Sequence, residues 1–190
     1  MKGLLAVWIA VLVGAAGWIG WDAWQGKQPS IGGPFTLTDQ NGKSFSSESL
    51  KGKPTLIYFG YAFCPDVCPT SLLLMETAIE QLGPDTAKKV NLVFITVDPE
   101  RDTPEVMKAY MGAFDPAFVA LIPSPEQLTA VAKDFKVYYK KVEGKTPGSY
   151  TMDHSAASFV YDPEGRLRLY ARYGAGPQVL ADDLKQLLQA

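Results

Sequence analysis

Two continuous apolar runs, each followed by a helix-forming segment, constrain the fold of this chain most strongly. The runs are Thr55–Phe59 and Asn91–Val97, and both have the pattern of strands that are buried on both faces. Apolar residues at helical spacing follow the first run over Thr70–Leu82, and Thr103-Pro104 opens a helix after the second. Buried strands that alternate with helices predict an α/β fold with a parallel central sheet.

Turn-forming sequences predict smaller elements around this centre. Two hairpins are expected, which join Phe35–Thr38 to Lys43–Phe45 and Ser158–Tyr161 to Arg166–Tyr170. Two further helices are expected, from Ser124 to about Phe135 and from Gln178 to Leu188. Val137–Tyr139 has the pattern of an edge strand, and Val142–Ser149 has that of a loop.

The domain organisation follows from where the apolar residues lie. The chain has 190 residues, 47% of them apolar, and shows no repeat, so one globular domain is expected at residues 35–190. An uncharged run at residues 3–21, with Trp18, Trp21 and Trp24 around its C-terminal end, predicts a transmembrane anchor at residues 1–24. The alternative is a cleaved signal segment, because Gly14–Gly17 offers small residues, but the run exceeds the usual length of a signal core. Residues 25–34 are rich in Gly, Pro and Gln and are expected to form a flexible tether.

The soft metal ligands of this chain are very few. Cys64 and Cys68 are its two cysteines, and His154 is its one histidine. Two thiolates and one imidazole suit a copper ion, because thiolate sulfur favours Cu(I) and imidazole serves both Cu(I) and Cu(II). The cysteine pair lies on the first strand-to-helix connection of an α/β chain that ends in an antiparallel hairpin. That order is a thioredoxin-like arrangement.

The spacing of the cysteines bears on their geometry and their reactivity. Residues four apart on a helix share one face, but Pro69 disfavours helical geometry at Cys68, so we expect the helix to start at Cys68 and Pro69. Unpaired N–H groups at a helix start lower a thiol pKa, which would favour the thiolate. The alternative role is a structural disulfide, although so short a loop would constrain the unfolded chain little.

His154 is a candidate third ligand, placed in a loop ahead of the Ser158 strand. The alternative is a surface histidine without a role. Asp153 would either orient the imidazole or be a solvated loop charge. Asp66, between the cysteines, would be either a partner-facing charge or a turn residue.

Other residues near these motifs have ordinary alternatives. Three methionines (Met107, Met111 and Met152) are expected to fill the core rather than bind metal. Three polar residues after the second strand (Asp98, Arg101 and Asp102) would border the site or cap the next helix.

Charge and targeting features limit the partners and the location. The formal net charge is -2, without the clustered Lys and Arg that phosphate binding needs, so nucleic acid is excluded as a partner. No Arg-rich presequence precedes the apolar run, which favours a single-pass protein of the bacterial inner membrane with its domain in the periplasm.

Three motifs together resemble the Sco/SenC family of cytochrome c oxidase assembly proteins. They are Gly60–Pro69, Thr96–Pro104 and Asp153–Ser155, and the resemblance covers the chain from Phe35 onward. It implies a thioredoxin-like fold that binds one copper through Cys64, Cys68 and His154. It also implies a role in maturing the dinuclear copper centre of oxidase subunit II and a cysteine pair that cycles between dithiol and disulfide. Apart from this resemblance, another periplasmic copper donor is considered as a second partner.

Two other functions remain open at this point. One is a thiol-disulfide oxidoreductase that reduces the oxidase cysteines, with Cys64 as nucleophile and Cys68 as resolving thiol. Three residues between the cysteines, where the thioredoxin motif has two, count against it. The other is a zinc structural module, but such sites usually have four protein ligands and three are available here.

Overall fold

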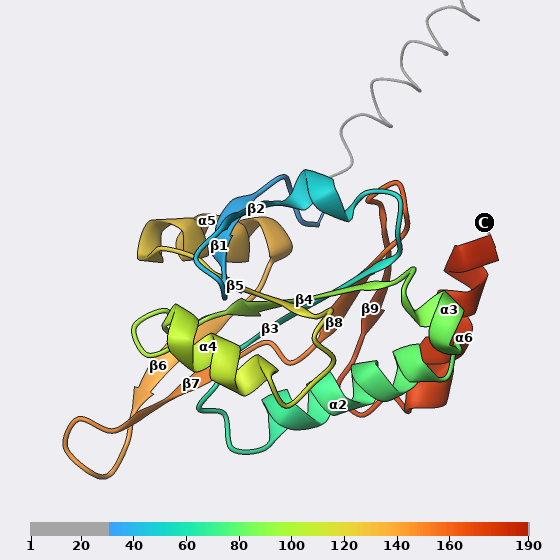
Figure 1. The fold of residues 1–190 in the computed structure, drawn as a ribbon. Coiled ribbons are helices and arrows are strands. Elements are labelled where there is room, and N and C mark those ends of the chain that lie inside the picture. The colour runs from blue at the N-terminus through green and yellow to red at the C-terminus, as the bar shows by residue number, and fades with distance from the viewer. Residues whose placement is uncertain (1–30, 190) are drawn as a thin grey trace, which may run out of the picture. The chain divides into compact units, whose positions relative to one another are not determined.

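The computed structural model describes residues 31–189 (Figure 1). The expected anchor at residues 1–24 and most of the expected tether lie outside this range. Within the described range, no helix is long and apolar enough to cross a bilayer. The packed domain reaches at least to Ile31, slightly before its expected start, because the Tyr161 hydroxyl donates to the Ile31 carbonyl and Gly32 N–H donates to the Asp134 carbonyl.

A seven-stranded mixed sheet forms the centre of the domain, with the strand order β2-β1-β5-β4-β3-β8-β9. Its strands are β1 (Thr36–Asp39), β2 (Ser44–Ser46), β3 (Thr55–Gly60), β4 (Asn91–Thr96), β5 (Val119–Ile122), β8 (Ser158–Tyr161) and β9 (Leu167–Ala171). β3, β4 and β5 are parallel, and β8 pairs antiparallel with β3 on its other side. The expected parallel centre and both expected hairpins, β1–β2 and β8–β9, are confirmed.

Helices cover both faces of this sheet (Figure 1). They are α2 (Val67–Glu80), α3 (Pro84–Ala87), α4 (Pro104–Met111), α5 (Pro125–Phe135) and α6 (Pro177–Gln189), with a short 3-10 helix, η1, at Ser47–Leu50. Alternate residues of β3 contact opposite layers. Phe59 packs against Phe135 of α5, whereas Gly60 faces the Cys68 sulfur of α2. The thioredoxin-like helix after the cysteine motif therefore covers the face opposite to α5.

A separate two-stranded sheet projects from the domain (Figure 1). It consists of β6 (Tyr139–Glu143) and β7 (Tyr150–His154), which pair antiparallel with each other. The expected loop at Val142–Ser149 is confirmed for residues 144–149, and only its first two residues belong to β6. The expected edge strand at Val137–Tyr139 was misplaced, because it shares only Tyr139 with β6. The pattern was hard to detect because half of the residues of β6 and β7 are exposed and only Met152 is buried, so neither strand has the continuous apolar run of β3 or β4.

Candidate metal centre

The cysteine loop, which carries Cys64, runs from the end of β3 to the first turn of α2, which carries Cys68. The helix begins at Val67, directly before the expected start at Cys68 and Pro69. Cys68 is completely buried, whereas Cys64 is half-buried in the loop. The Cys68 N–H, which has no intrahelical partner in this first turn, points at the Cys64 sulfur at 3.4 Å. Both cysteines are free, so the structure contains no disulfide between them.

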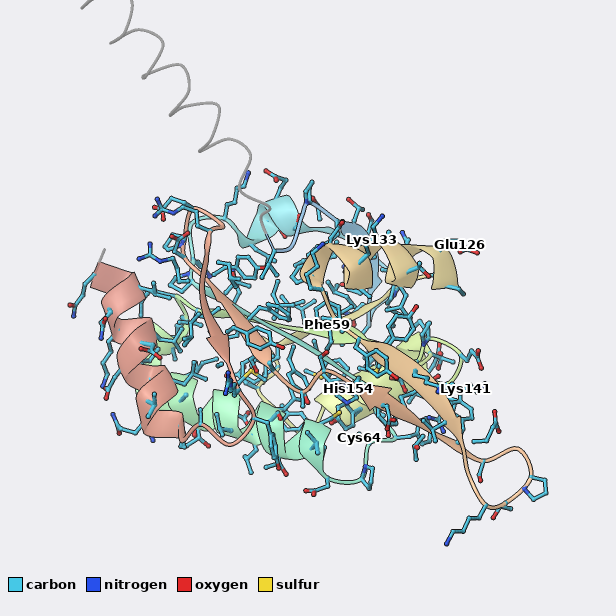
Figure 2. The ribbon with its side chains drawn as sticks, turned by 180° about the vertical axis from the view of Figure 1, so that it is seen from behind. Phe59, Cys64, Glu126, Lys133, Lys141 and His154 are labelled. Carbon is cyan, nitrogen blue, oxygen red and sulfur yellow. The ribbon has the colours of Figure 1, made fainter. Side chains whose placement is uncertain are left out.

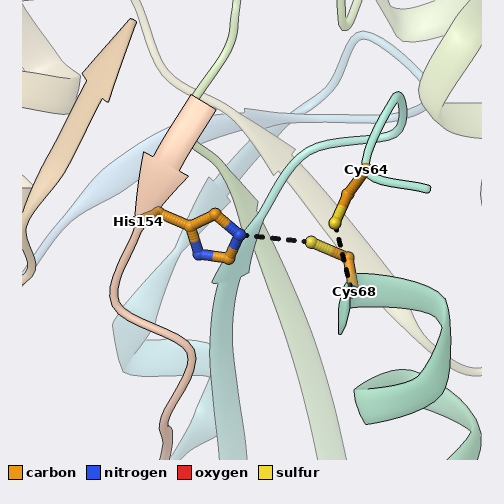
Figure 3. Close-up of side chains that lie close together, drawn as sticks. All are labelled: Cys64, Cys68 and His154. Carbon is orange, nitrogen blue, oxygen red and sulfur yellow. Dashed lines mark hydrogen bonds between the residues drawn. The ribbon is translucent and has the colours of Figure 1, made fainter. Parts of the chain in front are cut away.

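His154 approaches the cysteines as the last residue of β7, not from a loop as expected. Its Nε2 lies 3.4 Å from the Cys68 sulfur (Figure 3). Its Nδ1 lies 3.0 Å from the Ser155 carbonyl oxygen. A proton on Nδ1 would be donated to that carbonyl, which leaves the Nε2 lone pair directed at the sulfurs. The Ser155 carbonyl therefore orients the imidazole, and the exposed Asp153 carboxylate acts on it through its charge.

The three candidate ligand atoms converge on one point. The two sulfurs and an imidazole nitrogen all lie within 4.8 Å of one another. Cys64 and His154 lie on the side of the sheet away from α5, which carries Glu126 and Lys133 (Figure 2). Two thiols and one imidazole can bind a single soft ion at this point, because both donor types bind Cu(I) well. The donor set therefore fits copper, while a closed zinc site would need a fourth protein ligand.

Burial dominates the proton affinities in the site. It raises the pKa of the Cys68 thiol above its usual value, and the backbone contact with Tyr61 offsets this only in part. The expected lowering of the Cys68 pKa by the helix start is therefore wrong, because burial of the thiolate outweighs the effect of the helix N-terminus. Burial also lowers the pKa of His154, which favours the neutral imidazole that a metal requires.

Two tyrosines that the motif analysis did not single out form walls of the site. The rings of Tyr58 and Tyr61 meet the His154 imidazole edge-on, with centroids 6.3 Å and 5.8 Å away. Both tyrosines are buried. Tyr58 lies on β3 and Tyr61 directly follows it, so their position next to Cys64 in the sequence was the available signal. Aromatic residues in or beside a buried strand are, however, ordinarily interpreted as core.

The polar residues after β4 border the site and also support the next helix. Asp102 is fully buried and accepts hydrogen bonds from the Ala62 N–H of the cysteine loop, at 3.0 Å, and from the Thr96 hydroxyl. Asp98 is buried and forms an ion pair with Arg101. The cap of α4 is Thr103, whose hydroxyl accepts from the Val106 N–H. Asp102 thus holds the loop that carries Cys64, whereas Asp98 holds Arg101.

The remaining candidates have simpler places. Met107, Met111 and Met152 are buried in the apolar core, as expected. Asp66 is exposed at the N-cap of α2, where its side chain accepts a hydrogen bond of 3.4 Å from the Thr70 hydroxyl. Its exposure beside the cysteines is compatible with either role considered for it.

Comparisons with known proteins match this combination of fold and site. The family model described as SCO1/SenC matches residues 24–189. The chain is 41% identical over 158 residues to a "SCO2-like protein" of Rickettsia felis, which covers 82% of this chain and 76% of that protein. It is 42% identical to "Protein SCO2, mitochondrial" of Saccharomyces cerevisiae, which covers 72% of this chain and 46% of that longer protein.

Solved structures agree over most of the chain. "Structure of Bradyrhizobium japonicum ScoI with copper bound" aligns with a TM-score of 0.77 and 49% identity, covering 83% of this chain and 99% of that one. "Crystal Structure of Yeast Sco1 with Copper Bound" also gives a TM-score of 0.77, with 32% identity, covering 85% of this chain and 90% of that one. The expected thioredoxin-like α/β fold is therefore confirmed for the domain that the structure describes.

Proposed function

Because the chain belongs to the SCO1/SenC family, we propose that it is a copper chaperone for the assembly of cytochrome c oxidase. The observation that carries this proposal is the convergence of Cys64, Cys68 and His154 within 4.8 Å. These residues come from two distant segments of the chain and contain its whole stock of thiol and imidazole groups. Relatives of at least 32% identity were solved with copper bound, which supports copper as the ion carried here.

The ligands differ in exposure, and this difference suits delivery rather than storage. Cys68 is buried at the start of α2, whereas Cys64 and His154 are half-buried. A thiolate of an acceptor protein can therefore approach the ion from the side of Cys64 and His154, while Cys68 still holds it. Cys68 must lose its proton when the ion binds, and the ion's positive charge offsets the burial that otherwise favours the thiol.

The acceptor in this proposal is the dinuclear copper centre of oxidase subunit II. Copper would reach the chaperone from another periplasmic donor. The exposed Asp66 carboxylate lies two residues from Cys64 and would face either partner. The chain's net charge of -2, without a basic cluster, supports protein partners rather than nucleic acid.

The proposed location is the bacterial inner membrane, with residues 1–24 as a single anchor and the domain in the periplasm. Bacterial relatives and the uncharged run at residues 3–21 support it. In bacterial cells, the protein should stay with the membrane fraction and should be digested when protease is added to spheroplasts. Recovery in the soluble fraction, or protection from protease in intact spheroplasts, would contradict this location.

A second candidate function is reduction of the oxidase cysteines by the Cys64–Cys68 pair. The observation that favours it is that both cysteines are free and their sulfurs lie within the same 4.8 Å cluster. A disulfide could form there with little movement of the loop, since Cys64 already contacts the Cys68 N–H. Oxidoreductase activity and copper delivery would use the same residues, so they must be separated by experiment.

An anaerobic Cu(I) competition titration of the reduced full chain separates the two functions. We expect one equivalent to bind, and both His154→Ala and Cys64→Ser to weaken binding by at least about tenfold, because each removes a ligand. Met152→Leu is the matched control and should bind as the native protein does. Thiol reductase activity is measured on the same samples. Robust disulfide reduction without competitive copper binding would favour the oxidoreductase, and unchanged binding by His154→Ala would refute the three-ligand site.

A further inference from the structure

The sheet that carries His154 is not part of the seven-stranded sheet that positions the cysteines. β6 and β7 hydrogen bond to each other, while β3 pairs with β4 and β8. His154 nevertheless places Nε2 3.4 Å from the Cys68 sulfur. The β3–β8 pairing brings the segment before β8 to the cysteine loop, and contacts outside the strand ladders fix β7 itself relative to that loop.

Arg101 makes the most extensive of these contacts. Its Nη1 donates a hydrogen bond of 3.0 Å to the carbonyl of Tyr150, the first residue of β7. The guanidinium carbon also lies 3.6 Å from the centre of the Tyr150 ring, a cation–π contact at close range. The Arg101 side chain is only 25% exposed, so these contacts form in a largely desolvated place.

The same guanidinium reaches the cysteine loop. Its carbon lies 5.0 Å from the centre of the Phe63 ring, and Phe63 directly precedes Cys64. It also lies 5.7 Å from the ring of Tyr61, which in turn contacts the His154 imidazole. The planar Arg101 guanidinium thus lies between Phe63 and β7, the strand that ends at His154.

Asp98 fixes the guanidinium itself. The buried Asp98 carboxylate pairs with Arg101 Nε through one oxygen and accepts the Tyr150 hydroxyl at 2.9 Å through the other. The Lys141 ammonium lies 3.9 Å from the centre of the Tyr150 ring and pairs with Glu100. Tyr150 is therefore bound by its carbonyl, its ring and its hydroxyl to residues of the 98–101 turn.

We propose that Arg101 is a positioning residue for the copper site, which holds Tyr150 and Phe63 so that His154 meets the two cysteine sulfurs. A guanidinium stays protonated and has no lone pair to offer, so Arg101 is not a ligand. Its planar shape is essential, because it stacks on one ring while it donates to a carbonyl and a carboxylate. This inference rests on the proposed function, since it concerns the same ion.

A double-mutant cycle tests whether Arg101 acts through His154. Cu(I) affinity is measured by competition for the full chain, Arg101→Ala, His154→Ala and the double variant. We expect Arg101→Ala to weaken binding by about tenfold or more, as for other groups that orient a ligand. In the His154→Ala background, the same substitution should change affinity by less than about twofold, because the ligand that it positions is gone.

A spectroscopic readout separates positioning from general loss of structure. In the Cu(II) form, Arg101→Ala should weaken the nitrogen splitting of the EPR spectrum, as His154→Ala does, while far-UV circular dichroism stays native. Arg101→Lys keeps the charge but not the planar fork, so it should restore neither affinity nor splitting. Arg168→Ala, at an exposed arginine of β9 that pairs with Asp162, is the matched control and should bind normally.

If Arg101→Ala does not fold, Tyr150→Leu removes the ring and the hydroxyl that Arg101 and Asp98 contact. We expect it to weaken copper binding in the native chain but not in the His154→Ala background.

Equal losses of copper affinity in the native and His154→Ala backgrounds would overturn the inference. Full rescue by Arg101→Lys would also overturn it, because it would indicate a charge effect on the sulfurs. Normal binding by Arg101→Ala would refute the positioning role alone. Failure of the native chain to bind copper would refute the proposed function, and this inference with it.

Discussion

Gly60 is the single residue whose size most directly determines the geometry of the site. It ends β3, and a Cβ atom built there would lie 2.9 Å from the Cys68 sulfur and 2.9 Å from Cε2 of Phe94. Carbon atoms in folded proteins do not approach so closely without displacement. The absence of a side chain at Gly60 thus allows the first turn of α2 to bring its sulfur against the sheet.

Replacing Gly60 with alanine should therefore affect stability and copper binding together. We expect Gly60→Ala to lower the free energy of unfolding by about 1–3 kcal/mol, the usual cost of overpacking a core. It should also weaken Cu(I) binding, because the Cys68 sulfur must move away from His154. Gly33→Ala is the control, since its Cβ would meet Asp134 at an ordinary 3.5 Å. Denaturant unfolding and copper competition measure both effects, and unchanged copper affinity would show that the sulfur need not move.

At the scale of the elements, the β8–β9 turn depends on one buried carboxylate. Asp162 accepts backbone hydrogen bonds from Glu164 and Arg166 and pairs with the side chains of Arg166 and Arg168. Burial by itself would raise the pKa of Asp162, but the backbone N–H and the guanidinium of Arg166 bind its ionised form and lower the pKa overall. This turn fixes β9 beside β8, the strand that follows the His154 segment.

Asp162→Asn should destabilise the domain by about 1–3 kcal/mol at pH 7, because it removes hydrogen bonds to a charged group. The folded pKa is lowered, so the stabilisation is present above the unfolded pKa of about 3.9 and is lost as pH falls through the folded value. The difference in unfolding free energy between the two proteins should therefore shrink toward acid pH. Urea unfolding from pH 7 to pH 3 measures it. A difference that grows as the pH falls would contradict this account.

Elements with local signals were predicted well, and those without them were missed. Ser124 and Gln127 form a complete capping box at the start of α5, and Thr103 caps α4, so short-range chemistry marked both helix starts. β6 and β7 have no comparable short-range signal in the sequence. They are stabilised by pairing with each other and by contacts with distant residues, such as that of Arg101 with Tyr150. β5 was missed although β1 and β8 are equally short, because those two strands lie in hairpins marked by a turn sequence, whereas β5 pairs with the distant strands β1 and β4.

At the scale of the whole molecule, the sheet order brings distant segments together. β8 pairs with β3 although about a hundred residues separate them, and β1 pairs with β5 at the other side. The loop after β3 and the segment before β8 consequently lie at one end of adjacent strands. This arrangement brings His154 to Cys68, 86 residues earlier in the chain.

The ligand inventory, the parallel centre of the fold and the starts of α4 and α5 could be predicted from the amino-acid sequence, because they depend on residue identity and on contacts a few positions apart. The remaining features follow from packing between distant segments. The tertiary structure placed His154 on a strand, assigned its orientation to the Ser155 carbonyl, and joined β7 to the cysteine loop through Arg101. It also reversed the expected pKa shift of Cys68, since a helix start is visible in the sequence but the burial of a sulfur depends on what packs around it.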